Sequence, residues 1–130
     1  MDFNSFFVFP DEEKEIGFKQ TWTFTPKKNH LIAELPFFGK EYTVMFDIFV
    51  NKITFVESVL HIGLGGNMEK YGDRNPAIFV NKAPFGLHVA SSISGNLNYW
   101  KNPSVELNKW ISVEVSQTLR DGKVGITYHS

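Results

Sequence analysis

The chain has 130 residues, a formal net charge of −1, 13 Phe and no Cys. This length suffices for one domain with its own core, and the lack of Cys excludes disulfides, thiolate zinc sites and cysteine nucleophiles. A charge this close to zero argues against a nucleic-acid partner, and no apolar run reaches the roughly 18 residues that a membrane span needs. We therefore expect a single domain over residues 1–130.

Residues 1–15 are expected to be an irregular N-terminal segment, in which a strand or loop turns at Pro10 and runs into the acidic stretch 11–13. The start of the chain lacks a basic n-region, and its apolar patch 6–9 is too short for a signal peptide. No signal sequence is therefore expected in this chain.

Beyond this segment apolar residues recur with a period of two, which is typical of half-buried β-strands. The clearest case is 41–51, where apolar residues occupy every second position from Tyr42 to Val50. On the reverse face, Met45 and Phe49 indicate that this side is partly covered as well. Further strands are predicted over residues 18–25, 30–35, 58–64, 77–82, 86–93, 110–119 and 123–129.

The last two strands are expected to form a hairpin at Asp121-Gly122, a dipeptide that favours a type I′ turn. A two-residue loop there pairs Gln117 with Ile126 and places apolar residues opposite one another on one face. No stretch keeps a helical period over three turns. The predicted fold class is all-β, an antiparallel jelly-roll β-sandwich of two sheets.

Catalytic residue types are present but do not form catalytic patterns. No strand carries two acids on one face, as a retaining glycosidase needs in order to hold its carboxyl groups about 5–5.5 Å apart. Asp47 stands between Met45 and Phe49 on its face, and Glu114 stands between serines. The four His show no spacing that fixes a third metal ligand, and no Gly-x-Ser-x-Gly turn occurs. No catalytic residues and no metal centre are therefore expected.

The glycine-rich stretch 63–67 lacks the Gly-Lys-[Ser/Thr] ending of a phosphate loop, so its glycines are expected to supply positive φ in a tight connection. The same loop offers oxygen atoms of Asn67, Asp73 and Asn75, which makes calcium the cofactor to weigh here. Only one of the three is a carboxylate, so turn formation by these side chains is favoured over a calcium site.

The most suggestive segment is 94–103, which we interpret as a loop that mixes amide side chains with two adjacent large aromatic residues. Sugar binding uses this mixture, since an aromatic ring stacks on the C–H face of a pyranose while amide groups bond its hydroxyls. The alternative is that Trp100 plugs one end of the sandwich. The candidate ligand-binding residues from both loops are Asn67, Asp73, Asn75, Asn96, Asn98, Tyr99 and Trp100.

The strand 41–48, EYTVMFDI, resembles the YTV-x-F-D strand of concanavalin A-like lectins and glucanases. The stretch 107–117, LNKWISVEVSQ, followed by DGKV at 121–124, is similar to a laminin G-like pattern of a Trp-led strand, a DGK turn and a returning strand. The resemblance covers most of residues 18–130. It implies a concanavalin A-like jelly roll and an extracellular module for adhesion or carbohydrate binding.

Some features of that superfamily are missing. The E-x-D-x-E strand of its glucanases has no match, and His61 is followed by Gly63 where the H-x-N-x-R motif of galectins has Asn. Neither hydrolysis nor galactoside binding by that motif is therefore implied. Such domains continue for two or three strands beyond the DGK turn, whereas this sequence ends at Ser130. We expect either that the last strands are absent from this sequence or that another chain completes the sheet.

The sequence thus predicts a noncatalytic recognition module that binds a glycan or a protein through the end loops 65–76 and 94–103. The first alternative is a structural or assembly subunit, which forms a homodimer or binds a complementing chain through an exposed strand edge. The second alternative is a glycoside hydrolase of the same fold, with an acid pair assembled from different strands.

Overall fold

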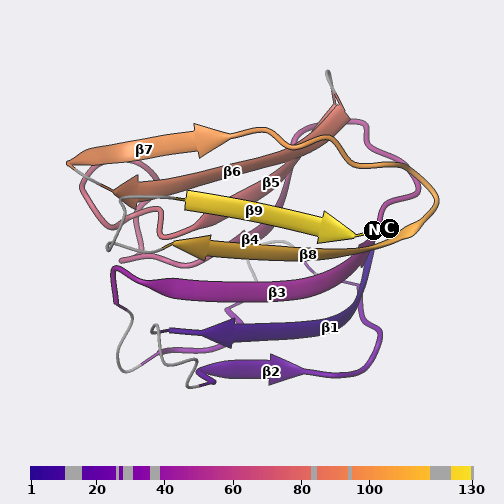
Figure 1. Ribbon diagram of the computed structural model, residues 1–130, viewed down its shortest axis with the longest axis horizontal. Helices are drawn as coiled ribbons and strands as arrows, with labels where there is room; N and C mark the ends of the chain where they lie inside the picture. The colour runs from indigo at the N-terminus through magenta and orange to yellow at the C-terminus, as the bar shows by residue number, and fades with distance from the viewer. Residues whose placement is uncertain are drawn as a thin grey trace. The chain divides into compact units, whose positions relative to one another are not determined.

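The computed structural model describes residues 1–10, 16–25, 27, 31–35, 39–82, 85–93 and 95–117, and the backbone of 124–129. All helical or strand structure in these residues is β-strand, in two antiparallel sheets of five and four strands (Figure 1), which confirms the all-β class. The chain divides into two compact units, residues 1–51 with 107–130 and residues 52–106, and each unit holds one of the sheets.

The five-stranded sheet has the order β2-β1-β3-β8-β9. Its central strand β3 confirms the predicted alternation, because Tyr42, Val44 and Phe46 are at most 2% exposed while Met45 is 37% exposed. Both neighbours of β3 align their own apolar residues with this buried row. The strands of this sheet are β1 (Asp2–Phe9), β2 (Phe18–Gln20), β3 (Tyr42–Phe49), β8 (Trp110–Gln117) and β9 (Val124–His129).

A cluster of phenylalanine rings fills the buried face of this sheet. The rings of Phe6 and Phe46 stack with centroids 5.3 Å apart, and Phe3 meets both edge-on at 5.6 and 5.9 Å. Phe24 stacks on Phe3 at 5.3 Å and exchanges two backbone hydrogen bonds with it, of 2.9 and 2.8 Å. Ring pairs of this kind add about 0.5–1.5 kcal/mol each beyond area burial, so much of the Phe content serves packing here.

The start of the chain corrects one prediction. Residues 2–9 form the strand β1, so of the strand or loop expected before Pro10 the strand is correct, and the description of 1–15 as irregular is wrong for this stretch. A bulge between Phe3 and Phe6 shifts the register of β1 against β3, so both rings are buried although they lie three residues apart. The extra residue breaks the period of two on which strand recognition depends.

Two other strand predictions differ from the structure. Residues 31–35 form no strand, and Leu31 is largely exposed. The strand predicted over 18–25 is regular only as β2, followed by an isolated bridge at Phe24.

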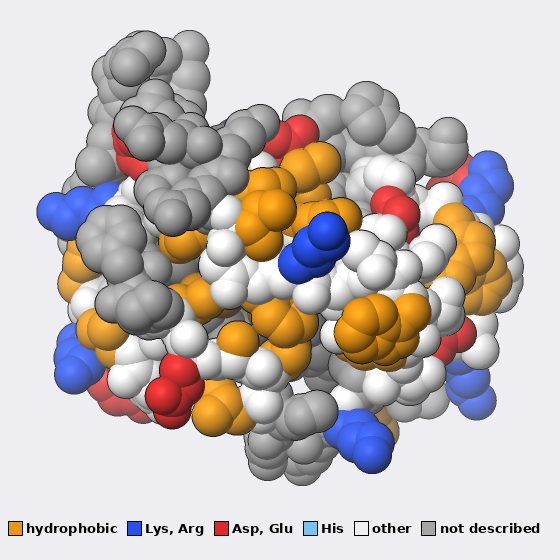
Figure 2. Space-filling model, turned by 90° about the horizontal axis from the view of Figure 1, so that it is seen from below, with side chains coloured by type: hydrophobic (Ala, Val, Ile, Leu, Met, Phe, Trp, Pro, Cys, Tyr) orange, Lys and Arg blue, Asp and Glu red, His pale blue; other side chains and the backbone are white. Residues whose placement is uncertain are grey.

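Seen from the β2 side, the surface shows hydrophobic side chains in several groups, with polar and charged side chains between them, instead of one continuous apolar patch (Figure 2).

The C-terminal hairpin pairs β8 with β9 as predicted, but in another register. Gln117 lies opposite Val124, and Val115 lies opposite Ile126, which is two residues away from the predicted pairing of Gln117 with Ile126. The predicted register is therefore wrong, and the turn at Asp121-Gly122 lies outside the described residues. Because a shift of two residues keeps every side chain on its face, the apolar pattern fits both registers equally well.

The four-stranded sheet has the order β4-β5-β6-β7 and lies wholly within residues 52–106. One face is apolar, since Ile78, Val80, Leu87 and Val89 are at most 2% exposed. On the other face Phe79 lies directly opposite His88. The strands are β4 (Glu57–His61), β5 (Ala77–Lys82), β6 (Phe85–Ile93) and β7 (Asn96–Lys101).

The strand β7 corrects the interpretation of 94–103 as a loop. Residues 96–101 pair with β6 in an antiparallel ladder, with Trp100 opposite Ala90 and Tyr99 opposite Ser91. Successive side chains of a strand point to opposite faces. The two adjacent aromatic residues, which we expected to act together in one loop, are therefore separated onto the two faces of the sheet.

Candidate functional site

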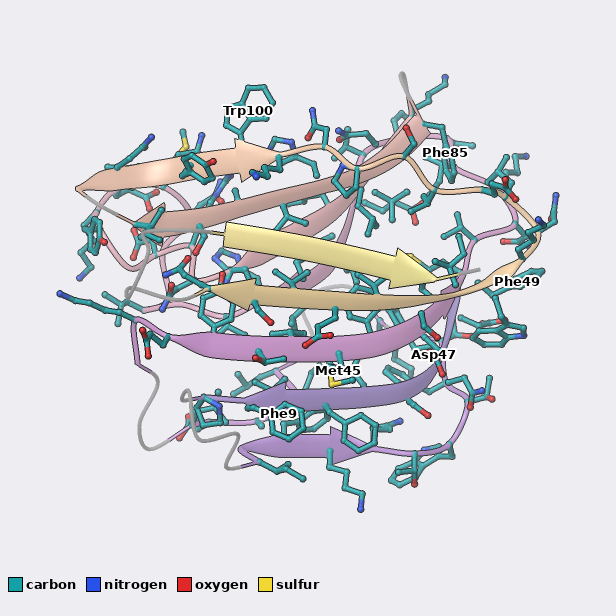
Figure 3. The ribbon with its side chains drawn as sticks, viewed as in Figure 1. Phe9, Met45, Asp47, Phe49, Phe85 and Trp100 are labelled. Atoms are coloured by element: carbon teal, nitrogen blue, oxygen red, sulfur yellow. The ribbon has the colours of Figure 1, made fainter. Side chains whose placement is uncertain are left out.

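Three rings from three neighbouring strands form a row across one face of the four-stranded sheet, and we call Phe79, His88 and Trp100 the aromatic row. The centroids of Phe79 and His88 are 6.0 Å apart, and those of His88 and Trp100 are 5.6 Å apart. The register explains the row, because Phe79 and His88 are direct partners and Trp100 is diagonal to His88. Trp100 projects from β7 (Figure 3) and is 54% exposed, so it is not a buried plug.

Arg74 stands at the Phe79 end of the aromatic row. Its Cζ atom lies 5.3 Å from the centroid of the Phe79 ring, a cation–π contact of about 0.5–1 kcal/mol. Nη1 donates a hydrogen bond of 3.1 Å to Oδ1 of Asn98, and Nη2 donates one of 2.8 Å to Oδ1 of Asn67. Arg74 thereby joins the two segments in which the ligand-binding residues were predicted.

The surface beside the aromatic row is hollowed. An open cavity of about 410 Å³ is lined by Val56, Arg74, Phe79, Asn81 and His88. It combines an apolar wall and two rings with an amide and a cation, and small-molecule sites typically have a few polar groups of this kind in an apolar lining. Such a lining can stack on a flat ring and hydrogen-bond to groups at the edge of that ring.

One ring nitrogen of His88 is engaged by Asn102, the residue after the end of β7. Nδ1 of His88 is hydrogen-bonded to Oδ1 of Asn102. This contact occupies Nδ1, so Nε2 is the ring nitrogen that it leaves for a ligand.

The loop that carries Arg74 is held from within by Asp73, which is 1% exposed. Oδ2 of Asp73 accepts hydrogen bonds from the backbone N–H groups of Glu69 and Lys70 at 3.1 and 3.0 Å. The carbonyl oxygen of Asp73 accepts a third, of 2.6 Å, from Nε2 of His61. Burial raises the pKa of the Asp73 carboxyl, but the hydrogen bonds from Lys70 and Glu69 and the charge of Lys70 lower it, and the net pKa is below the ordinary value of 3.8.

Acid is therefore expected to destabilise this loop through Asp73. A carboxyl whose pKa is lowered by folding contributes stability above its unfolded pKa, and this contribution is lost as the pH falls through the folded pKa. Asp73→Asn should be less stable than the native protein at neutral pH and should lose less stability below about pH 4. Denaturant unfolding measured across this pH range checks the prediction, with Asp2→Asn as the control for a partly exposed carboxylate that accepts a hydrogen bond from Thr25. Parallel pH profiles of the native protein and Asp73→Asn would contradict it.

The structure brings together only some of the predicted ligand-binding residues. Asn67, Asn98 and Trp100 gather around Arg74 and the aromatic row. Tyr99 lies on the opposite face, and Oδ1 of Asn96 accepts a 2.9 Å hydrogen bond from the backbone N–H of Asn98.

Three of the oxygens considered for calcium accept hydrogen bonds within the protein. Arg74 donates to Asn67, backbone N–H groups donate to Asp73, and Ser91 donates to Oδ1 of Asn75 at 3.4 Å. Oδ1 of Asp73 is buried with no hydrogen-bond partner in the described part of the chain. The described residues contain no group of three or more His, Asp or Glu that could hold a metal ion. Arg74, Ser91 and the backbone of the loop thus use three of the oxygens named here.

Four residues that line the cavity beside the aromatic row were not predicted as ligand-binding residues: Arg74, Phe79, Asn81 and His88. Phe79 and Asn81 alternate with the buried Ile78 and Val80, which marks them as residues of the other face of β5. That alternation is visible in the sequence. Their meeting with His88 depends on which strand lies beside β5, and this information is not local.

The acids of the enzyme alternative lie on the five-stranded sheet. Asp47 is opposite Ser112, and Met45 is opposite Glu114, so the two carboxylates are diagonal neighbours on the face where Figure 3 shows Met45 and Asp47. Each accepts a hydrogen bond from a serine: Asp47 from Ser112 at 2.5 Å and Glu114 from Ser116 at 3.4 Å. Both carboxylates thus help to join side chains on the surface of the sheet.

No helix among the described residues is long and apolar enough to cross a membrane. Comparison with protein-family models, with curated proteins and with solved structures gives no match for this chain. A function is therefore inferred from the residues of the site.

Proposed function

We propose that the protein is a noncatalytic recognition module that binds a glycan across the aromatic row of the four-stranded sheet. The observation that carries this proposal is the row itself, with the half-exposed ring of Trp100 at one end and Arg74 at the other. A pyranose has an apolar C–H face that stacks on such a ring and hydroxyl groups at its edge that need donors and acceptors.

Polar side chains lie where those hydroxyl groups need partners. Asn81 lines the cavity next to Phe79. Asn98 lies on the same face of β7 as Trp100, two residues before it. An amide offers both a donor and an acceptor, which suits a hydroxyl group that is itself both. The proposed site therefore lies on the face of a sheet, and the loop 65–76 contributes to it through Asn67 and Arg74.

The resemblance to the concanavalin A-like superfamily belongs to this proposal, with its jelly-roll arrangement and extracellular location. What supports it is the fold class alone: the described chain forms two antiparallel sheets and no helix. Its specific carbohydrate sites are not carried over, since their motifs are absent from the sequence.

Replacing Trp100 by alanine is expected to weaken glycan binding at least about tenfold, the loss typical of a central aromatic contact. Tyr99→Ala is the matched control, because it removes the adjacent aromatic residue, which is also exposed, from the opposite face of the same strand. A glycan array identifies a glycan, neutral or charged, that the native protein binds. Titration calorimetry then compares the affinity of the native protein and of both variants for this glycan.

Equal losses for Trp100→Ala and Tyr99→Ala would contradict the proposal, because binding would then not depend on the aromatic row. A glycan array on which the native protein binds nothing would also contradict the proposal. If the array shows no binding and light scattering detects dimers in solution, the alternative is favoured in which the protein is an assembly subunit that pairs through a strand edge.

A further inference from the structure

The cavity beside the aromatic row carries a positive charge that the described chain does not neutralise. Its lining contains the guanidinium of Arg74 and the imidazole of His88 but no carboxylate. Among the described residues the hydrogen-bond partners of Arg74 are the neutral Asn67 and Asn98, and no acid forms an ion pair with it. A guanidinium at the wall of a cavity is a ready partner for an anion.

The hydrogen bonds of Arg74 leave part of it free for a ligand. Each terminal nitrogen of a guanidinium has two N–H groups. Nη1 uses one for Asn98 and Nη2 uses one for Asn67, so each keeps one N–H. The two amides and the Phe79 ring hold the guanidinium in place, so little side-chain freedom is lost when an anion binds.

The acids of the same loop do not compete for Arg74. Both carboxylates are directed at backbone N–H groups: Oδ2 of Asp73 at those of Glu69 and Lys70, and Oε2 of Glu69 at those of Asn67 and Met68. The loop therefore uses its negative charges to hold its own backbone and presents its cation to the cavity.

We infer that the ligand is an anionic sugar, whose carboxylate or sulfate group binds Arg74 while its ring lies along the aromatic row. This inference rests on the proposed function and adds the ligand class to it. The charge-assisted hydrogen bonds of Arg74 select the anion, and Nε2 of His88 is placed to bond a neighbouring hydroxyl group.

The test compares matched pairs of probes that differ only in charge. The first pair is an oligosaccharide of glucuronic acid and its carboxyl-reduced, neutral counterpart, and the second is dextran sulfate and dextran. We expect the native protein to bind at least one anionic probe at least about tenfold more tightly than its neutral partner. The first pair reports a carboxylate and the second a sulfate ester as the source of the anion.

Two variants assign the preference to Arg74. Arg74→Gln should abolish it, and Arg74→Lys, which keeps the charge but not the fork of donors, should retain only a part. Lys101→Gln is the control: it removes a positive charge from the next residue after Trp100, on the opposite face of β7, and should leave the preference unchanged.

The outcomes separate this inference from the proposed function. Equal affinity of the native protein for anionic and neutral probes would overturn the inference, while a loss of that binding in Trp100→Ala would still support glycan recognition. An anionic preference that survives in Arg74→Gln but disappears in Lys101→Gln would also overturn it, as general attraction of a polyanion. Because the native protein alone gives the first comparison, the test does not depend on the folding of any variant.

Discussion

Replacing Phe6 by alanine is expected to lower the free energy of unfolding by about 3–5 kcal/mol, the usual cost of deleting a buried aromatic side chain. Phe6 is 1% exposed, and its ring lies 5.3 Å from that of Phe46 and 5.6 Å from that of Phe3. The substitution removes these two ring pairs and a third, with Phe18 at 6.2 Å, and leaves a cavity next to the central strand of the five-stranded sheet.

Phe7→Ala is the matched control for this prediction. Phe7 is the next residue of β1 and lies on the other face, where it is partly exposed and where its ring stacks on Phe9 at 6.4 Å. It should lose clearly less stability than Phe6→Ala, since less of its ring leaves water on folding. Chemical denaturation of both variants gives the comparison, and equal losses would contradict the difference in burial between Phe6 and Phe7.

Gly63→Ala is expected to be the most damaging single-methyl change in the residues 52–106. A Cβ atom at this position would lie 1.9 Å from the carbonyl oxygen of Asp73 and 2.7 Å from its carbonyl carbon. Those atoms are backbone, and the oxygen accepts the hydrogen bond from His61, so neither can move without opening the loop. The loss should reach or exceed the upper end of the roughly 1–3 kcal/mol that overpacking costs.

Gly95→Asn is the control for Gly63→Ala. Gly95 has a φ of +78°, which Asn tolerates better than other side chains, and no described atom outside its chain neighbours lies within 4 Å of its added Cβ. It should change stability far less than Gly63→Ala. Thermal unfolding with hydrogen exchange of residues 62–76 would test this, and a native-like exchange pattern in Gly63→Ala would contradict the close approach of the two backbone segments.

Gly63 and Gly65 show that a loop can need its glycines for different reasons. The stretch 63–67 was expected to need glycine for positive φ, and Gly65 does have a φ of +109°. At Gly63 the constraint is instead contact with a backbone segment ten residues further along the chain, at Asp73. Local sequence reports which turns a residue favours, but it does not report which other backbone passes beside it.

The candidate site shows the same division. The amides and Trp100 were chosen as candidates from composition, because their chemistry suits a sugar whatever the fold. The predicted arrangement is wrong, because residues 96–101 form a strand instead of a loop, and a strand puts Tyr99 and Trp100 on opposite faces. Arg74 and His88 could not be chosen over other cations and histidines in the chain, since only the position of Phe79 between them makes them parts of one site.

The sequence by itself determined the all-β class and the buried face of β3, because a strand has a side-chain period of two and burial follows from alternate apolar residues. Tertiary structure alone decided the register of β8 with β9, the bulge in β1 and the meeting of Arg74, Phe79, His88 and Trp100. The physical reason is that a slip of two residues leaves the apolar pattern unchanged, so backbone pairing between distant strands chooses which exposed side chains become neighbours.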